Sequence, residues 1–348
     1  MGFGAQVHLP ALSSLPGVEV IAIAGGGSGT ARHAALALGV SRTSGAWRDV
    51  VAADDIDAVS VATPPSLHTE VVCAALSAGK HVLCEKPFGR TTKEAAVMVE
   101  AARNSGRVSA VNFQFRMEPG IVALKRQVEA GTIGRVRRID VAWLTGGRSD
   151  PSRPWSWQHD AELGGGVLGA LVSHVIDYVE WIVDQPIVGL FARTQILIHC
   201  RSDKEGRQRS VTAEDSADLI CALAQEGIAN LRVSNCYRHG SGHQIDIVGD
   251  LGRLTYRHQA PFAPDEAQVL VELGSKGLVG VPLEPLPCGP GRDTRTPAFR
   301  QLASRFVDAI RGRAVRDLPD FHRGLRIRQL LDAARESHRL GKWIPCAH

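Results

Sequence analysis

The sequence has few of the features that mark several protein classes. Aromatic residues make up only 5% of its 348 residues, which argues against a platform on which nucleic-acid bases stack. Lys and Arg number 40 and Asp and Glu number 36, so the formal net charge is only +4, and no long basic run occurs. We therefore expect a mixed surface with at most local anion sites, and no nucleic-acid partner.

Paired cysteines and long apolar runs are also missing. The seven cysteines are widely spread and include no C-x-x-C pair, which argues against a zinc ribbon or a redox dithiol. No apolar run approaches the about 20 residues of a membrane span, and no basic-then-apolar leader opens the chain. We expect a cytoplasmic protein with free thiols, no metal site and no membrane partner.

What the sequence does contain is a change of texture near Met117. Before it, short apolar strands alternate with helices, which is typical of a parallel α/β sheet. After it, strands follow one another with turn signals between them, which predicts an α+β domain with an open mixed or antiparallel sheet flanked by helices. We predict a doubly wound Rossmann domain over residues 1–117 and a substrate-binding and oligomerisation domain over residues 118–348.

Some segments carry more local expectations. The charged stretch Arg201–Arg209 is predicted to be a surface loop, and residues 282–296, rich in Pro and Gly, are predicted to be irregular. Two helices near residues 298–311 and 324–340 are expected to close the chain.

The nucleotide motif at the N-terminus is broken. A Rossmann domain opens with a strand that runs into G-x-G-x-x-G/A, whose glycines let the backbone approach a pyrophosphate at a helix N-terminus. Here Gly2 takes the place of the second glycine, Gly4 that of an additional one, and Ala5 that of the third small residue. The first glycine and the preceding strand are absent, so two neighbouring strands are expected to lose a ladder partner.

Two explanations for this clipped motif stay open. Translation starts upstream, with Met1 standing at the variable position of G-x-G, or the gene has decayed. Intact-mass measurement on protein from the native gene separates them.

Three later segments carry more specific signals. Ala62–His68 reads A-T-P-P-S-L-H and ends a strand where a cofactor crosses the sheet edge. Gly79–Pro87 reads G-K-H-V-L-C-E-K-P, with Glu-Lys-Pro at a strand end. Gly164–Asp177 reads G-G-G-V-L-G-A-L-V-S-H-V-I-D. Together with the strand order, these segments resemble the Gfo/Idh/MocA family of NAD(P)-dependent dehydrogenases from residue 1 to about residue 345.

The resemblance implies the roles of the central residues. Lys86 is expected beside the nicotinamide and the substrate hydroxyl, and His174 is expected to be the acid/base. Histidine titrates near neutral pH, and an ammonium stabilises a developing alkoxide, so both residue types suit alcohol oxidation. Glu85 is expected to hydrogen-bond near the cofactor ribose or to orient Lys86. The alternatives are a surface lysine and a satisfied core histidine.

The surroundings of His174 leave further questions. Asp177, three residues on, either orients His174 or is solvated. Many family members carry Asp four residues before the histidine, but that position is Ala170 here. The departure puts a Lys-Asp-His mechanism in doubt, although Lys86 and His174 can still support hydride transfer.

Other candidates lie at the domain junction and in a loop. Arg116, after the last Rossmann strand, contacts cofactor or substrate, or is a solvated arginine. Trp155 and Trp157 precede the glycine-rich segment, in a loop that approaches the site in this family. They offer a face for a sugar ring or serve as a packing staple. His68 is expected to contact backbone and not to act as a catalyst.

The cofactor choice depends on the end of the second Rossmann strand. An NAD enzyme usually has Asp or Glu there, but the sequence reads A-G-G-G-S-G-T-A-R from Ala24 to Arg32. Ser28 and Arg32 could meet a phosphate, so NADP is favoured over NAD, unless Arg32 simply faces solvent. The predicted cofactor-binding residues are Gly2, Phe3, Gly4, Ala5, Ser28, Thr63, Pro64, Pro65, His68, Glu85, Lys86 and Arg116. The predicted substrate-binding residues are Lys86, Trp155, His174 and Asp177.

These observations predict an oxidoreductase that transfers hydride to or from a hydroxyl or keto carbon of a sugar, cyclitol or related polyol. The family resemblance also implies a homodimer or homotetramer built on the exposed face of the second-domain sheet. One alternative is a relative that hydrolyses glycosidic bonds through transient oxidation with a tightly held NAD. The other is a non-catalytic or decayed nucleotide-binding protein, which the clipped motif and Ala170 both favour.

Overall fold

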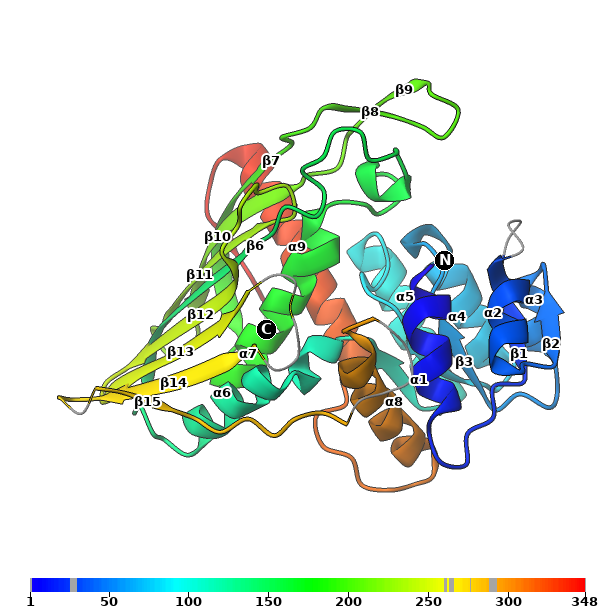
Figure 1. Cartoon of the computed structure of the whole chain (residues 1–348), viewed down its shortest axis with the longest axis horizontal. Coiled ribbons are helices and arrows are strands. Elements are labelled where there is room, and N and C mark those ends of the chain that lie inside the picture. Colours follow the sequence, from blue (N-terminus) through cyan, green and yellow to red (C-terminus); the bar gives the residue numbers. More distant parts are fainter. Residues whose placement is uncertain are drawn as a thin grey trace. The chain divides into compact units, whose positions relative to one another are not determined.

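The computed structural model of the chain divides into two compact units (Figure 1). It describes residues 2–25, 30–259, 262, 266–275, 277–287 and 293–347. Unit 1 comprises Met1–Met117 and Leu286–Arg328, and unit 2 comprises Glu118–Pro285 and Gln329–His348. Within the described ranges, no helix is long and apolar enough to cross a membrane.

Unit 1 alternates strands and helices, as the sequence predicts. Its strands are β1 (Ala22–Ala24), β2 (Arg42–Ser44), β3 (Ala58–Val61), β4 (His81–Cys84) and β5 (Ser109–Val111). Its helices are η1 (Gly4–His8), α1 (Leu9–Ser13), α2 (Thr30–Leu38), α3 (Trp47–Ala52), η2 (Pro65–Leu67), α4 (His68–Ser77), α5 (Thr92–Ser105), η3 (Gln114–Met117), α8 (Thr296–Ile310) and the first part of α9 (Phe321–Leu340).

The described strands of unit 1 form two separate parallel sheets. One pairs β1 with β2, and the other has the order β3-β4-β5. A doubly wound sheet normally places its first strand between the strands that correspond here to β1 and β3. The separation therefore agrees with the expectation that two strands lack a common partner.

Strand β4 is covered on both faces. Val82, Leu83 and Cys84 are all fully buried, although successive side chains of a strand point to opposite faces. Leu83 packs in one core with residues of α1 and α8, including Phe299. Because α8 supplies this apolar face, residues 286–328 belong with unit 1. The predicted boundaries, 1–117 and 118–348, match the division at Met117 but assign this returning segment to the other domain.

Unit 2 contains most of the remaining chain. Its strands are β6 (Val136–Leu144), β7 (Ile187–Gln195), β8 (Cys200–Ser202), β9 (Gln208–Ser210), β10 (Ser216–Leu223), β11 (Ile228–Ser234), β12 (Gly242–Gly249), β13 (Gly252–His258), β14 (Gln268–Leu273), β15 (Leu278–Gly280) and β16 (Ile344–Pro345). Its helices are α6 (Pro119–Glu129), η4 (Trp157–His159), η5 (Leu168–Val172), α7 (Ser173–Val183) and the end of α9.

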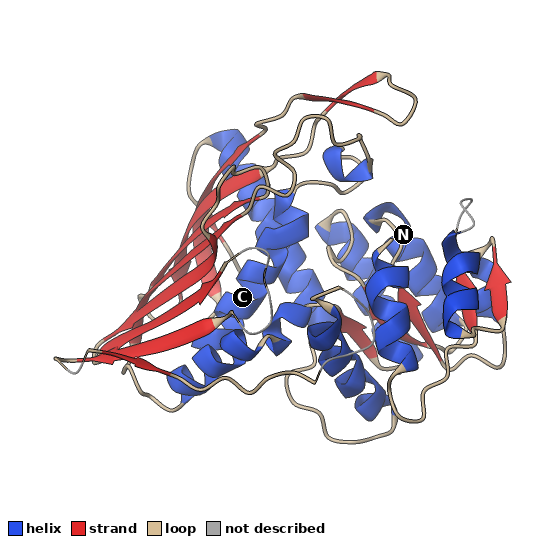
Figure 2. Ribbon diagram, in the orientation of Figure 1, coloured by secondary structure: helices blue, strands red, loops and turns tan. Residues whose placement is uncertain are grey.

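The large sheet of unit 2 is mixed, as predicted. Its strand order is β15-β14-β13-β12-β6-β11-β10-β7-β16, and neighbours are antiparallel except β6 and β11. Along β10, buried Ala217, Leu219 and Cys221 alternate with less buried residues, so one face is covered. Helices α6 and α7 cover that face (Figure 2).

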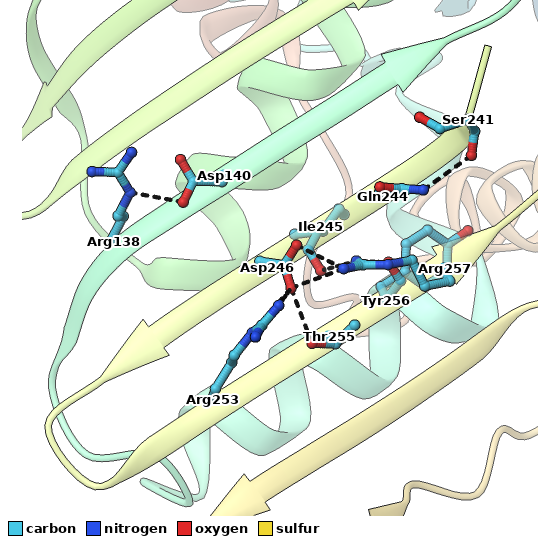
Figure 3. A network of polar contacts seen from close by, with 10 residues as sticks. All are labelled: Arg138, Asp140, Ser241, Gln244, Ile245, Asp246, Arg253, Thr255, Tyr256 and Arg257. Atoms are coloured by element: carbon cyan, nitrogen blue, oxygen red, sulfur yellow. Dashed lines mark hydrogen bonds and ion pairs between the residues drawn. The ribbon is translucent and has the colours of Figure 1, made fainter. Parts of the chain in front are cut away.

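The other face of this sheet carries a polar network (Figure 3). Asp246 on β12 accepts hydrogen bonds from Arg253, Thr255 and Arg257, at 3.0 Å from Thr255 Oγ1 and 2.9 Å from Arg257 Nη2. On β6, Arg138 Nε donates to Asp140 Oδ2 at 2.7 Å. The contacts of Asp246 hold long side chains in place across β12 and β13, and the Arg138 contact does so within β6.

The segment Arg201–Arg209 is not the surface loop that the sequence predicts. It contributes to a two-stranded hairpin of β8 and β9, in which Arg201 pairs with Arg209. The Arg201 side chain is only 2% exposed, because its guanidinium donates to the carbonyl oxygens of Arg148, Asp150 and Arg153. Burial of an arginine is tolerated when such acceptors replace water. The prediction was therefore wrong for Arg201 and for the two short strands, whereas residues 203–207 between them form a turn at the surface.

Candidate functional site

Polar and small residues gather at the carboxyl ends of the parallel strands of unit 1. Thr63 follows β3, Glu85 and Lys86 follow β4, and Asn112 follows β5. In open α/β sheets, ligands bind at this edge. The predicted cofactor residues Thr63, Glu85 and Lys86 therefore lie where such a site is expected.

The N-terminal turn has the local structure of a nucleotide loop. Gly4 begins the π-helix η1, and the amide groups of Ala5 and Gln6 donate to Gly2 O. A Cβ at Gly4 would lie 3.1 Å from Ala62 Cβ, so the small residue allows the turn to approach the end of β3. A Cβ at Gly2 would meet nothing within 4 Å, so the backbone there is open to a ligand.

Phe3, predicted to bind cofactor, has packing contacts. Its ring lies edge-on to His8, with centroids 5.3 Å apart, and the Arg295 guanidinium lies 4.6 Å from its centroid. The backbone of Phe3 remains in the turn, so a cofactor contact by its main chain is compatible with this arrangement.

The T-P-P loop and the E-K-P loop are tied together by His68. This histidine is fully buried at the start of α4, with Nε2 2.9 Å from Thr63 O and Nδ1 3.2 Å from Pro87 O. Burial lowers the pKa of His68, while its two carbonyl contacts act in the opposite direction. His68 is thus a backbone-contacting residue, as the sequence argument expects. Pro64 and Pro65 lie in the loop that it holds.

Two buried polar atoms at this edge of the sheet have a bearing on ligand binding. The Thr63 hydroxyl has no hydrogen-bond partner among the described residues, and neither does Asn112 Oδ1. Buried polar atoms are nearly always satisfied in folded proteins. Together with the open backbone at Gly2, these two atoms fit a polar group such as a dinucleotide at this edge.

Glu85 is the centre of a buried hydrogen-bond network. Its Oε1 lies 2.9 Å from His8 Nε2 and accepts a hydrogen bond from Asn112 Nδ2, while His8 Nδ1 lies 2.8 Å from Ser60 Oγ. Burial alone would raise the pKa of Glu85, but His8, the nearby Lys86 charge and Asn112 together lower it. Glu85 is therefore an ionised group that faces His8 and Asn112.

Sequence reasoning missed His8, Asn112 and Gln114 as members of this network. Asn112 Nδ2 also donates to Gln114 Oε1 at 2.9 Å. Asn112 and Gln114 follow β5 as Thr63 follows β3 and Glu85 follows β4. The rule that placed the other residues at strand ends would have found these two as well. For His8 the sequence has no such signal, because its partner Glu85 is 77 residues away.

Arg116 and Ser28 are placed differently from the other cofactor candidates. Arg116 lies in η3, which packs against α8, and is 6% exposed, so it is not a solvated arginine. The burial of Arg305 on α8 lowers the pKa of that residue, and the charge of Arg116 adds a smaller effect in the same direction. Ser28 lies outside the described residues. Arg32, the other basis for favouring NADP, is exposed on α2.

In unit 2, the glycine-rich segment leads into α7, which carries His174. His174 is 3% exposed and Asp177 is 1% exposed, so Asp177 is not solvated. The preceding η5 is a π-helix, in which hydrogen bonds run from residue i to i+5. The comparison of Ala170 with the residue four positions before the histidine assumes regular α-helical spacing, and the π-helix changes that spacing here. π-Bulges are frequent at functional sites.

Trp155 has the contacts of a packing residue. Its backbone N–H donates to Ser202 O at 2.8 Å, and its indole Nε1 donates to Ser210 O at 3.1 Å, so it joins its loop to the β8–β9 hairpin. The Arg209 guanidinium lies over its ring, 4.9 Å from the centroid. These contacts are those expected if Trp155 serves in packing, and the Arg209 guanidinium covers one face of its ring.

Within the described part of the chain, no group of three or more His, Cys, Asp or Glu side chains could hold a metal ion. The chemistry of the candidate residues is that of proton transfer and charge stabilisation. Lys86 supplies an ammonium, and His174 and Asp177 supply a buried imidazole and carboxylate.

Two family models match the chain. The model of an oxidoreductase family with an NAD-binding Rossmann fold (GFO_IDH_MocA) matches residues 1–113. The model of the GFO/IDH/MocA C-terminal domain matches residues 121–255.

Characterised and uncharacterised relatives agree with these matches. An uncharacterized oxidoreductase of Synechocystis sp. is 34% identical over 73% of this chain and 68% of its own. Levoglucosan dehydrogenase of Pseudarthrobacter phenanthrenivorans is 29% identical over 68% of this chain and 66% of its own, so just under two thirds of that relative is spanned. Inositol 2-dehydrogenase of Rhizobium meliloti is 25% identical over 74% of each chain.

Solved structures are similar over the whole length. A levoglucosan dehydrogenase in complex with NADH and L-sorbose superposes with a TM-score of 0.88 at 26% identity, covering 99% of this chain and 97% of that one. An oxidoreductase domain protein from Kribbella flavida has a TM-score of 0.88 at 26% identity, covering 100% and 98%.

Proposed function

Because this chain belongs to the Gfo/Idh/MocA family of oxidoreductases, with an NAD-binding Rossmann domain, we propose that it transfers hydride to or from a hydroxyl or keto carbon of a sugar, cyclitol or related polyol. The observation that carries this proposal is the group of polar residues at the strand ends of unit 1. Ionised Glu85 lies beside Lys86, and the buried Thr63 hydroxyl has no hydrogen-bond partner among the described residues.

The proposed roles follow from the chemistry of each side chain. A bound nicotinamide dinucleotide accepts or supplies the hydride. The Lys86 ammonium stabilises negative charge on the substrate oxygen, and Glu85 orients that ammonium. His174 takes or returns the hydroxyl proton, and Asp177 orients its ring. Glu85 is thus a positioning residue in this scheme, held in turn by His8 and Asn112.

We propose an uncharged anhydrosugar, sugar or cyclitol as the substrate class. The support is the similarity to levoglucosan dehydrogenase and inositol 2-dehydrogenase, whose names state what those relatives act on. A purified sample screened with levoglucosan, L-sorbose and myo-inositol, each with NAD and with NADP, tests the class and the cofactor together. The increase of absorbance of the reduced cofactor reports turnover.

The matched variants are Lys86→Ala and Lys93→Ala. Lys93 is an exposed lysine of α5 in the same unit, so its loss controls for a general change of charge. We expect Lys86→Ala to lower kcat by about 100-fold or more, as removal of one charge-stabilising group does, and Lys93→Ala to leave it unchanged. Undiminished turnover in Lys86→Ala would contradict the assignment.

The same screen separates the two alternative functions. A hydrolase of the family that regenerates its own cofactor would consume a glycoside without net formation of reduced cofactor. A nucleotide-binding protein without catalysis would bind NADH, seen by fluorescence titration, and turn over none of the substrates.

We also propose that the exposed face of the large sheet pairs with a second copy of the chain. Support comes from the ordered network around Asp246 (Figure 3) and from exposed apolar side chains on the same sheet, Ile220 at 49% and Ile228 at 44%. Light scattering after size exclusion should give a multiple of 37.3 kDa. Ile220→Asp should lower that mass, and an unchanged monomer mass in the parent protein would refute the proposal.

A further inference from the structure

A small cavity in unit 2 lies outside the residues assigned so far. Its volume is about 10 Å³, and Arg148, His159 and Arg201 line one part of it. Asn235, which follows β11, and the acidic residues Glu214 and Asp215 also line it. A volume of this size holds one water-sized particle.

Three buried polar atoms of the lining residues lack a hydrogen-bond partner in the described part of the chain. They are Arg201 Nε, His159 Nε2 and Asn235 Oδ1. Their residues are 2%, 5% and 7% exposed, respectively. Leaving a buried donor or acceptor unsatisfied is costly, so three such atoms around one cavity indicate an occupant.

The hydrogen bonds of His159 show that Nε2 is a donor. Its Nδ1 accepts a hydrogen bond from the backbone N–H of Ser156 at 3.0 Å, so the proton of the neutral ring must be on Nε2. Burial, with the charges of Arg201, Arg148 and Arg153, lowers the pKa of His159 to about 4, so the ring is neutral at pH 7. Arg201 Nε–H is a second donor.

The Asn235 amide can also present a donor to the cavity, because turning it over exchanges its N and O without breaking a described hydrogen bond. The amide N and O of asparagine are assigned and not observed, so a half-turn places Nδ2–H₂ where Oδ1 is. The Asn235 side chain makes no hydrogen bond in the described part of the chain that would be lost in this turn.

The arginines at and near the cavity are not in direct contact with a carboxylate of the described residues. Within the described ranges, none of the guanidiniums of Arg148, Arg153 and Arg201 forms an ion pair with a carboxylate. Burial, followed by the charges of Arg153 and Arg201, lowers the pKa of Arg148 to about 10, as expected for a cation without a counter-ion.

The two carboxylates of the lining are already engaged with backbone amides. Asp215 accepts from the N–H groups of Leu197 and Ile198, and Glu214 accepts from Leu168 N–H. Their negative charges equal in number the guanidiniums of the lining, Arg148 and Arg201, so what favours an anion is the set of unpaired donors and not the net charge. The two carboxylates leave the donors of Arg201 and His159 without an acceptor.

We propose that this cavity is a binding site for a single monatomic anion, chloride in the cell, held by Arg201 Nε, His159 Nε2 and the amide of Asn235. A polyatomic anion such as phosphate is excluded by the volume of about 10 Å³. The anion joins the segment that contains His159 to the end of β11. Because Gly166 N–H donates to Gln158 O, the same segment holds the glycine-rich stretch before α7.

A crystal of the wild-type protein soaked in sodium bromide tests the site directly. With data collected above the bromine absorption edge, we expect an anomalous difference peak in the cavity within contact distance of Arg201 Nε and His159 Nε2. A cavity that holds an ordered water, or nothing, with no anomalous peak would overturn the proposal. This readout does not depend on enzymatic activity, so it stands or falls separately from the proposed function.

A solution experiment adds a matched pair of variants. Arg148→Met removes a guanidinium that donates no hydrogen bond in the described part of the chain, so the fold is expected to persist. Arg193→Met removes an exposed arginine of β7 as a control.

The readout is the midpoint of thermal unfolding in sodium chloride against sodium gluconate at equal ionic strength. Chloride at 100 times its Kd raises the folding equilibrium constant about 100-fold. We expect this dependence in wild type and Arg193→Met and a loss of it in Arg148→Met. Equal midpoints in the two salts for wild type would contradict the proposal.

Discussion

Acid should destabilise unit 2 through His243, a histidine buried in its core. His243 on β12 is 3% exposed, stacks on Trp143 with centroids 4.4 Å apart, and has Nε2 2.8 Å from the Tyr178 hydroxyl on α7. Burial, with a smaller contribution from the charge of His258, lowers the pKa of His243 to about 3. The ring is therefore neutral in the folded protein over the whole physiological range.

The sign and size of the effect follow from proton linkage. The folded pKa lies below the unfolded value of about 6.5, so only the unfolded chain binds this proton between pH 6.5 and 3. Stability is thus complete above pH 6.5 and is lost as the pH falls. The share of His243 in the loss is about 2 kcal/mol at pH 5 relative to pH 8, and approaches about 5 kcal/mol below pH 3.

The assay is urea unfolding, followed by circular dichroism, at pH 8 and pH 5. The variant is the double substitution Tyr178→Phe and His243→Phe, because exchanging both partners of a buried hydrogen bond for apolar groups is nearly neutral, whereas His243→Phe alone strands the tyrosine hydroxyl. Other titrating groups are common to both proteins. The double variant should therefore lose about 2 kcal/mol less than wild type between these pH values.

The control is His239→Asn, which removes an exposed histidine of the same unit. It has a positive φ of 54°, a conformation that asparagine tolerates. The control should follow wild type. Parallel pH dependence of wild type and the double variant would show that His243 does not couple protonation to folding.

Three further substitutions probe the other regions. Glu85→Gln removes the negative charge beside His8, and we expect turnover to fall with a changed pH profile, measured as kcat against pH; an unaltered profile would refute a positioning role. Thr63→Val removes a hydroxyl that has no described partner, so calorimetry should show unchanged or slightly higher stability, and titration should show weaker NADH binding. Gly166→Ala places a Cβ 2.2 Å from Glu214 Oε1 at a φ of +104°, and the unfolding midpoint should fall by several degrees, corresponding to about 1–3 kcal/mol.

Local sequence signals were sufficient where local chemistry decides the structure. The Glu-Lys-Pro motif was predicted at a strand end, and β4 ends at Cys84, directly before it. The family, the fold class and a nicotinamide cofactor are confirmed by the comparisons. The assignment of individual site residues stays a prediction.

Partners that are distant in the sequence could not be predicted. The buried environment of Arg201 depends on carbonyl groups about 50 residues earlier, so its charge alone indicated a surface loop. The contact of His8 with Glu85 joins residues that are 77 positions apart, and nothing in the sequence near either residue indicates the other. The return of residues 286–328 to unit 1 was missed because an amphipathic helix does not reveal which core it covers.

That return has a consequence for synthesis of the protein. The apolar face of β4 and β5, with Leu83 and Ala110, is completed by Phe299 and its neighbours on α8. A domain at the start of a chain usually folds while the ribosome is still working, but this one waits for residues made almost 200 positions after its sheet. Until α8 has left the ribosome, the nascent sheet exposes one apolar face, and such exposed surface makes a nascent chain prone to aggregation.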